Sequence, residues 1–306
     1  MFILNTRYFG KVMVSLDSQY SLGEEIEQFS QLRIGTMIEG SPLYRSKHIY
    51  VPPIPQSKLG FNEIYIIHLL RRPERKKIMT NTLYDLGIDF TFFDAVDGNK
   101  LNDTYLESQG IVMLPGYIDF NDGRPLTMGE IACFLSHYTI WEEMVSKNYE
   151  KIIIFEDDVQ LEPFFKRKLV KLMREVEELV PKWDLIYLGR IPLDDDSEIM
   201  VKDSSALIWP NYSYGCYGYI LSRRGAKKLL SHKPLQRIMA LDEYIPILFN
   251  KHPIEEWKVQ FKPRNLVAVS VEPLLLDIFE DSISDTDDSS LIETGDDDTD
   301  NEESEY

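Results

Sequence analysis

The chain has few cysteines, no long apolar run and no basic residue near its carboxyl end. Only Cys133 and Cys216 occur among 306 residues, which excludes a disulfide-stabilised scaffold and a cysteine-rich zinc motif. We expect two buried thiols instead. No apolar run approaches the roughly 20 residues that a membrane-spanning helix needs, so we expect no transmembrane segment.

The acidity of the chain is concentrated at its carboxyl end. The formal net charge is −18, and residues 281–306 hold 12 Asp and Glu without any Lys or Arg. The remaining residues 1–280 therefore carry about −6. We expect residues 281–306 to form a disordered acidic tail, because their apolar content is too low for a core. This charge balance disfavours nucleic acid as a partner.

The first residues lack the features of a secretory signal. The segment 1–16 has no cationic start and no small-residue cleavage site, so we expect no targeting signal in this sequence. Two glycosylation sequons begin at Asn102 and Asn211, which is compatible with a lumenal protein. About one such sequon is expected by chance, so this indication is weak.

The chain divides into three predicted regions. Residues 1–57 form an appendage without a clear sheet pattern, ending in a proline-rich connector at 51–57. Residues 58–280 form the main domain, and residues 281–306 form the tail. The hydrophobic content of 43% is enough for one large core.

Within the main domain, apolar strand patterns alternate with amphipathic helix patterns. This alternation predicts an α/β fold with a mostly parallel open sheet flanked by helices. Thr127 followed by Glu130 is a capping-box pattern that predicts a helix start. The predicted strands are 63–69, 89–94, the apolar part of 151–158 before its three carboxylates, 183–188 (closed by Gly189), 212–221 and 264–270. The predicted helices are 73–86, 127–147, 161–180, 224–230 and 241–249, with a polar loop at 194–205.

The segment KIIIFEDD at 151–158 is the strongest local signal of chemistry. An apolar strand ends there in Glu156, Asp157 and Asp158, and open α/β sheets bind ligands at the carboxyl ends of their strands. Three adjacent carboxylates suit a hard divalent cation that carries nucleotide phosphates. The alternative is an acidic loop or helix start, since acidic residues also favour a helix N-terminus.

A series of ordered motifs resembles glycosyltransferase family 25, most closely its animal branch. The motifs include IYIIHL at 64–69, RRPER at 71–75, DAVDG at 94–98, LPGY at 114–117, GRPLT at 123–127, GEIACFLSH at 129–137, FEDD at 155–158, WDLIYLGR at 183–190, DEY at 242–244 and SVEPLL at 270–275. The resemblance covers about residues 60–288. It implies a GT-A-like fold and an inverting transfer of galactose from UDP-galactose to hydroxylysine of collagen, with Mn²⁺, in the endoplasmic reticulum lumen.

The resemblance and the chemistry of the residues together suggest a set of roles. Glu156, Asp157 and Asp158 would hold the metal. Arg71 and Arg72 would meet the uridine or phosphate end of the donor, although a solvated helix start explains these arginines equally well.

Two further carboxylates are candidates for the catalytic base. Asp242 and Glu243 would take the proton of the acceptor hydroxyl, and helix N-capping is the alternative for Asp242. His137 is expected to be a packed histidine rather than a ligand. Asp285 and Asp287 resemble another acidic motif of the family, but a solvated charge run is their default interpretation.

Some positions depart from the family pattern. His68 stands where asparagine is usual, Ala132 where glycine is usual, and Gly215 to Gly218 where the animal enzymes have a tryptophan-containing run. Two functions therefore remain open: an active galactosyltransferase, or a catalytically silent relative that acts as a binding or adhesion protein.

Overall fold

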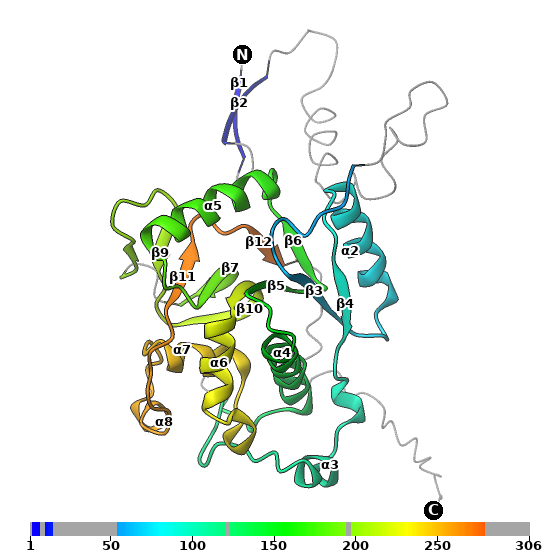
Figure 1. Cartoon of the computed structure of the whole chain (residues 1–306), viewed down its shortest axis with the longest axis vertical. Helices are drawn as coiled ribbons and strands as arrows, with labels where there is room; N and C mark the ends of the chain where they lie inside the picture. Colours follow the sequence, from blue (N-terminus) through cyan, green and yellow to red (C-terminus); the bar gives the residue numbers. More distant parts are fainter. Residues whose placement is uncertain (1, 7–9, 15–53, 120–122, 194–196, 279–306) are drawn as a thin grey trace, which may run out of the picture.

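A computed structural model describes residues 2–6, 10–14, 54–119, 123–193 and 197–278 (Figure 1). The elements in chain order are β1 (Phe2–Thr6), β2 (Gly10–Val14), β3 (Glu63–His68), α2 (Pro73–Asp85), β4 (Thr91–Asp94), η2 (Gly98–Lys100), α3 (Asp103–Ser108), α4 (Met128–Ser146), β5 (Lys151–Glu156), β6 (Val159–Leu161), α5 (Phe165–Leu179), β7 (Leu185–Pro192), β8 (Ile199–Met200), β9 (Leu207–Trp209), β10 (Ser213–Ser222), α6 (Arg223–Ser231), η3 (Pro234–Arg237), α7 (Leu241–Leu248), α8 (Glu255–Lys258), β11 (Ala268–Val271) and β12 (Leu276–Ile278).

The structure describes only part of the predicted terminal regions. Most of the predicted appendage, the acidic tail, and Asp285 and Asp287 with it, lie outside the described residues. Within the appendage, β1 and β2 pair as antiparallel strands, a pairing that the sequence pattern did not indicate. The boundaries at residues 57 and 280 stay predictions.

An open sheet of eight strands forms the centre of the described part, in the order β4-β3-β5-β10-β7-β11-β9-β8. β3 pairs in parallel with both β4 and β5, and β11 pairs in parallel with β7. β10 runs antiparallel between β5 and β7, and β9 runs antiparallel to both β11 and β8. Six strands therefore point one way and only β10 and β9 point the other way. This arrangement confirms the predicted α/β fold with a mostly parallel sheet.

Helices cover both faces of this sheet, as Figure 1 shows. In β5, Ile152 and Ile154 pack into the core formed with α4, α6 and α7. Ile153 and Phe155 pack into the opposite core, formed with α2 and α5. Successive side chains of a strand point to opposite faces, so an unbroken apolar run is what a sheet buried on both faces requires.

Local signals fix the helices that border the site. Thr127 caps α4 by accepting a hydrogen bond from the Glu130 backbone, and the Glu130 carboxylate accepts one from the Thr127 backbone at 2.7 Å. The predicted capping box is therefore confirmed. Pro73 occupies the first turn of α2, and Gly87 follows its end with a φ of +66°. No helix in the described ranges is long and apolar enough to span a membrane.

Three predicted boundaries were wrong for reasons of tertiary contact. α5 begins at Phe165 rather than at residue 161, because Leu161 pairs with Leu276 in a small second sheet. β7 continues through Gly189 to Pro192. A Cβ on Gly189 would lie 2.8 Å from the Leu276 side chain, so this glycine permits a close approach rather than ending the strand. The predicted polar loop contains the short edge strand β8, whose residues Ile199 and Met200 are exposed.

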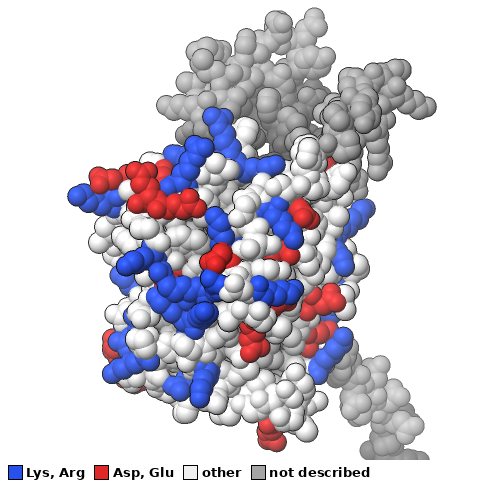
Figure 2. All heavy atoms as spheres, viewed as in Figure 1, with Lys and Arg blue, Asp and Glu red and all other residues white. Residues whose placement is uncertain are grey.

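The surface of the described part carries charges of both signs. Figure 2 shows Lys and Arg interspersed with Asp and Glu on the face in view.

The strands β3, β5 and β7 end at one edge of the sheet, where the starts of α4 and α7 also converge with β10. This edge carries the candidate site.

Candidate functional site

A cavity of about 550 Å³ opens at the carboxyl edge of the sheet. Its walls come from segments far apart in the chain: the ends of β3, β5 and β7, the first half of β10, and the starts of α4 and α7. The polar residues that line it are Arg71, Arg75, Glu130, Cys133, Ser136, His137, Glu156, Asp157, Asp158, Tyr214, Cys216, Tyr217 and Asp242.

The predicted acidic cluster lines this cavity, and its middle residue, Asp157, is fixed by contacts with His68 and Arg75. Asp157 follows the end of β5 and is only 5% exposed. One of its oxygens lies 2.8 Å from Nδ1 of His68, and the other accepts a hydrogen bond from Arg75 at 3.2 Å. These contacts fix the turn that presents Glu156 and Asp158 to the cavity.

Asp158 is the least satisfied member of the acidic cluster. Its Oδ1 is buried and has no hydrogen-bond partner among the described residues. Its Oδ2 lies 3.4 Å from Arg75. Burial, reinforced by the nearby Glu156 charge, raises the pKa of Asp158 to about 7, although Arg75 opposes the shift.

Glu156 shares this environment at the last position of β5. Burial and the charge of Asp157 raise the pKa of Glu156 to about 7. Carboxylates whose pKa is raised in this way bind protons that a cation would displace. The carboxylate chemistry of this cluster, with an orphaned oxygen on Asp158, suits a hard divalent cation such as Mn²⁺ or Mg²⁺. Its three carboxylates do not, however, form a group of converging ligand atoms among the described residues, where Glu156 converges instead with Cys133 and His137.

The two arginines predicted to bind the donor differ in their placement. Arg71 lines the cavity, and its Nε lies 3.5 Å from an oxygen of Asp97. Arg72 occupies the N-cap position of α2 and does not line the described cavity. Arg75, one turn further along α2, lines the cavity and contacts Asp157 and Asp158. Sequence reasoning missed Arg75, although its spacing of three to four residues from Arg71 and Arg72 puts it on the same side of the helix start.

The two candidate bases also differ. Asp242 lines the same cavity as the acidic cluster, and its Oδ2 accepts a hydrogen bond from the Gly215 backbone at 3.3 Å. Burial and the adjacent Glu243 charge raise the pKa of Asp242 to about 7. The N-cap of α7 is Ala240, so helix N-capping does not account for Asp242.

Glu243 is fully buried, does not line the cavity and belongs to a network of hydrogen bonds behind it. Its carboxylate accepts hydrogen bonds from the hydroxyl groups of Tyr212 and Tyr214, both at 2.6 Å, and lies 2.5 Å from Nε2 of His252. Tyr214 lines the cavity, whereas Glu243 does not. Glu243 therefore supports a wall of the site rather than facing an acceptor.

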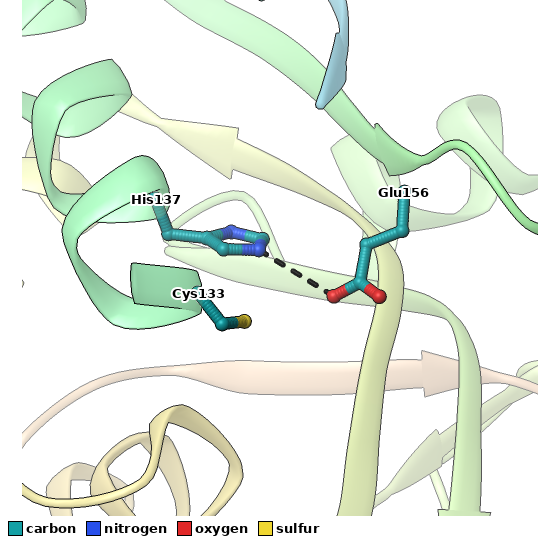
Figure 3. A group of neighbouring side chains, drawn as sticks. All are labelled: Cys133, His137 and Glu156. Carbon is teal, nitrogen blue, oxygen red and sulfur yellow. Dashed lines mark ion pairs between the residues drawn. The ribbon is translucent and has the colours of Figure 1, made fainter. Parts of the chain in front are cut away.

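His137 is packed in the core and also reaches the site. Its ring stacks on Tyr219 with 5.7 Å between centroids, in agreement with a packed histidine. Burial lowers the pKa of His137 to about 3, so the ring is neutral. Its Nε2 lies 3.5 Å from Glu156, and Cys133 comes from the preceding turn of α4 (Figure 3). Cys133 and Cys216 are both free thiols.

The departures from the family pattern lie at or directly behind this cavity. Ala132, Gly215, Cys216 and Tyr217 line it, and His68 holds Asp157. Gly215 has a φ of +69°, and a Cβ at that position would lie 2.5 Å from the Tyr217 ring. The backbone of β10 therefore requires a glycine at the point where it meets Asp242.

The comparison with known families agrees with this geometry. The family described as "Glycosyltransferase family 25 (LPS biosynthesis protein)" matches residues 61–245, a range that contains every residue lining the cavity except Ile278. The chain belongs to glycosyltransferase family 25. Residues 246–278 of the described structure lie beyond the matched range and add β11 and β12.

Relatives in glycosyltransferase family 25 include proteins with different names. A "Glycosyltransferase 25 family member" of Aedes aegypti is 44% identical over 96% of this chain and 49% of its own length. "Procollagen galactosyltransferase 1" of Danio rerio is 43% identical over 90% of this chain and 46% of its own length. "Probable inactive glycosyltransferase 25 family member 3" of Bos taurus is 42% identical over 89% of this chain and 46% of its own length. The chain spans about half the length of these relatives.

Proposed function

We propose that this chain is a metal-dependent, inverting galactosyltransferase that moves galactose from UDP-galactose to hydroxylysine of collagen. The observation that carries the proposal is that Asp242 and the acidic cluster, Glu156 to Asp158, line one cavity. The relative from Danio rerio is named for this activity. The proposal places the reaction in the endoplasmic reticulum lumen, as the family resemblance implies.

In this proposal, the acidic cluster forms the metal site for Mn²⁺. Asp158, with its orphaned oxygen, and Glu156 would hold the ion directly, while Asp157 fixes their positions through His68 and Arg75. A bound divalent cation supplies positive charge that neutralises the diphosphate leaving group. Arg71, which lines the cavity, would meet the phosphate or uridine end of the donor, whereas Arg72 lies outside the described cavity and is not assigned this role.

Asp242 would act as the catalytic base. Its carboxylate takes the proton of the acceptor hydroxyl, the hydroxyl oxygen forms a bond to the anomeric carbon of galactose, and the bond from that carbon to UDP breaks. A single displacement of this kind inverts the anomeric configuration. A base whose pKa lies near 7 is well matched to neutral pH.

The second candidate is a catalytically silent binding or adhesion protein. The substitutions at Ala132 and at Gly215 to Tyr217 favour it, because they line the cavity that would hold the donor. A relative from Bos taurus is named as a probable inactive member.

Transfer of galactose from UDP-galactose to a hydroxylysine-containing collagen peptide tests the proposal, with and without Mn²⁺. We expect Mn²⁺-dependent product that is lost in Asp158→Ala and retained in Glu178→Ala, which changes an exposed carboxylate on α5. Calorimetry with UDP and Mn²⁺ separates the two candidates. Metal-dependent UDP binding without turnover by the folded chain would favour the silent protein, and turnover that persists in Asp158→Ala would contradict the assigned metal site.

A further inference from the structure

Three chemically different metal-binding side chains meet beside the acidic cluster. Cys133 and His137 lie four residues apart in α4 and therefore on the same face of that helix. Glu156 faces them from the end of β5, and all three side chains point toward one another in Figure 3. A ligand atom from each, namely the Cys133 thiol sulfur, a ring nitrogen of His137 and a carboxylate oxygen of Glu156, lies within 4.8 Å of the other two.

Nε2 of His137 lacks a hydrogen-bond partner among the described residues. The residue is 1% exposed, and its Nε2 is buried and makes no hydrogen bond in the described part of the chain, with an oxygen of Glu156 at 3.5 Å. The other ring nitrogen, Nδ1, lies 2.8 Å from the hydroxyl of Tyr219. This hydroxyl also accepts a hydrogen bond from Trp141 at 2.9 Å. One nitrogen held by a polar group and the other left bare toward a carboxylate is the arrangement found in metal-ligating histidines.

We propose that Cys133, His137 and Glu156 bind a divalent cation of borderline softness, for which Zn²⁺ is the best match. Thiolate, imidazole and carboxylate together are typical zinc ligands, whereas Mn²⁺ and Mg²⁺ prefer oxygen alone. Ligand atoms around a tetrahedral zinc lie roughly 3.3–3.8 Å apart, given zinc–ligand bonds of about 2.0–2.3 Å. Since these atoms lie within 4.8 Å of one another, they need to close by about 1.5 Å at most.

The cavity supplies the path and the remaining ligand position. Cys133, His137 and Glu156 all line it, so a cation and a water molecule reach the site from solvent. On binding, the S–H bond of Cys133 breaks, a sulfur–zinc bond forms and the proton passes to solvent.

This site differs from the oxygen-only site of the acidic cluster in all but one ligand. Asp157 and Asp158 are held by Arg75, whereas Glu156 lies beside His137. Glu156 alone belongs to both sets, and the soft ligands of α4 are what distinguish the proposed site.

Titration of the full chain with Co²⁺, a spectroscopic substitute for Zn²⁺, tests the proposal directly. We expect a thiolate-to-cobalt charge-transfer band in the near ultraviolet that reaches its maximum at one equivalent and is abolished by Zn²⁺. Acidic residues elsewhere bind Co²⁺ through oxygen and produce no such band. A wild-type chain that shows no thiolate band on saturation would overturn the proposal, whatever the stability of any variant.

Variants then assign the ligands. Cys133→Ser abolishes the band, whereas Cys216→Ser, which changes the other thiol of the same cavity, retains it. Asp158→Asn also retains it, because this change affects only the oxygen-only site. Tyr219→Phe, which removes the hydroxyl behind His137, weakens Zn²⁺ binding about 10- to 100-fold. A band that persists in Cys133→Ser, or one that is lost in Cys216→Ser instead, would contradict the assignment.

Discussion

His68 and Asp157 are joined across the ends of two parallel strands, with 2.8 Å between Nδ1 and Oδ2. His68 ends β3, and Asp157 follows the last residue of β5. Both residues are buried, with exposed fractions of 1% and 5%. The contact with His68 therefore fixes Asp157 to the neighbouring strand β3, and the hydrogen bond from Arg75 fixes it to α2.

Replacing His68 by alanine is expected to lower the free energy of unfolding by about 2–4 kcal/mol, because a buried ring is lost and one oxygen of Asp157 loses its partner. Urea denaturation followed by circular dichroism measures the change. His232→Ala is the control, since His232 is half-buried against Phe261 and makes no carboxylate contact among the described residues. An equal loss in both variants would show that the contact with Asp157 adds nothing.

Asp242→Asn is expected to reduce kcat by about 10²- to 10⁴-fold, the usual contribution of a positioned general base. The wild-type rate should fall as the pH drops below about 7, because only the ionised carboxylate accepts the proton. Burial is the main cause that raises the pKa of Asp242, the charges of Glu243 and Glu130 add to it, and the hydrogen bond from the Gly215 N–H lowers it. A pH profile of kcat/KM measures both effects, and an unchanged acid limb in Asp242→Asn would exclude Asp242 as the base.

The raised pKa of Asp242 also predicts that replacing this residue by asparagine stabilises the fold at high pH, although the same replacement lowers activity. The folded-state pKa of Asp242 is about 7 against an ordinary value of 3.8. Its contribution to stability is therefore fully present below about pH 4 and is lost as the pH rises through 7. Asp242→Asn should raise the free energy of unfolding at pH 8 by on the order of 2 kcal/mol and change it little at pH 4. Metal-free thermal unfolding at both pH values tests this, and destabilisation at pH 8 would be the contrary result.

Glu243→Gln is expected to act on stability rather than on proton transfer. The amide cannot accept from Tyr212, Tyr214 and His252 as the carboxylate does, and a buried network that loses an acceptor costs about 2–4 kcal/mol. The folded fraction should keep the acid limb of the pH profile. A variant as stable as the wild type but without activity would instead identify Glu243 as the base.

Gly215→Ala is expected to destabilise the chain by about 2–3 kcal/mol and to lower activity, because it adds a clash with Tyr217 to the cost of a positive φ. Gly110→Ala is the control, since Gly110 has a φ of +65° but open space around the added Cβ. The control should lose only about 1 kcal/mol. Comparable melting temperatures for the two variants would remove Tyr217 as the reason for the glycine.

Elements with a local signal were predicted well. The run of apolar residues in β5 is buried on both faces, and Thr127 with Glu130 forms the predicted capping box. The errors arose where partners distant in sequence decide the outcome. Leu161 extends a strand because it meets Leu276, and Gly189 stays within a strand because Leu276 packs against it.

The candidate site divides in the same way. The position of Glu156, Asp157 and Asp158 at a strand end follows from the sequence, since the apolar run and its charged boundary are local. The contrast between Asp242 and Glu243 does not, because adjacent helix residues point in different directions. Only packing decides which of the two faces the cavity and which lies among Tyr212, Tyr214 and His252.

By itself, the sequence determined the class of this protein: periodicity specifies an α/β sheet covered on both faces, and ordered motifs specify glycosyltransferase family 25. The tertiary structure alone decided how the motifs meet. It placed the end of β5, the start of α4 and the start of α7 around one cavity, and it brought Cys133, His137 and Glu156 together. The physical reason is that pKa values, orphaned polar atoms and ligand sets depend on burial and on contacts between distant segments, which no local pattern encodes.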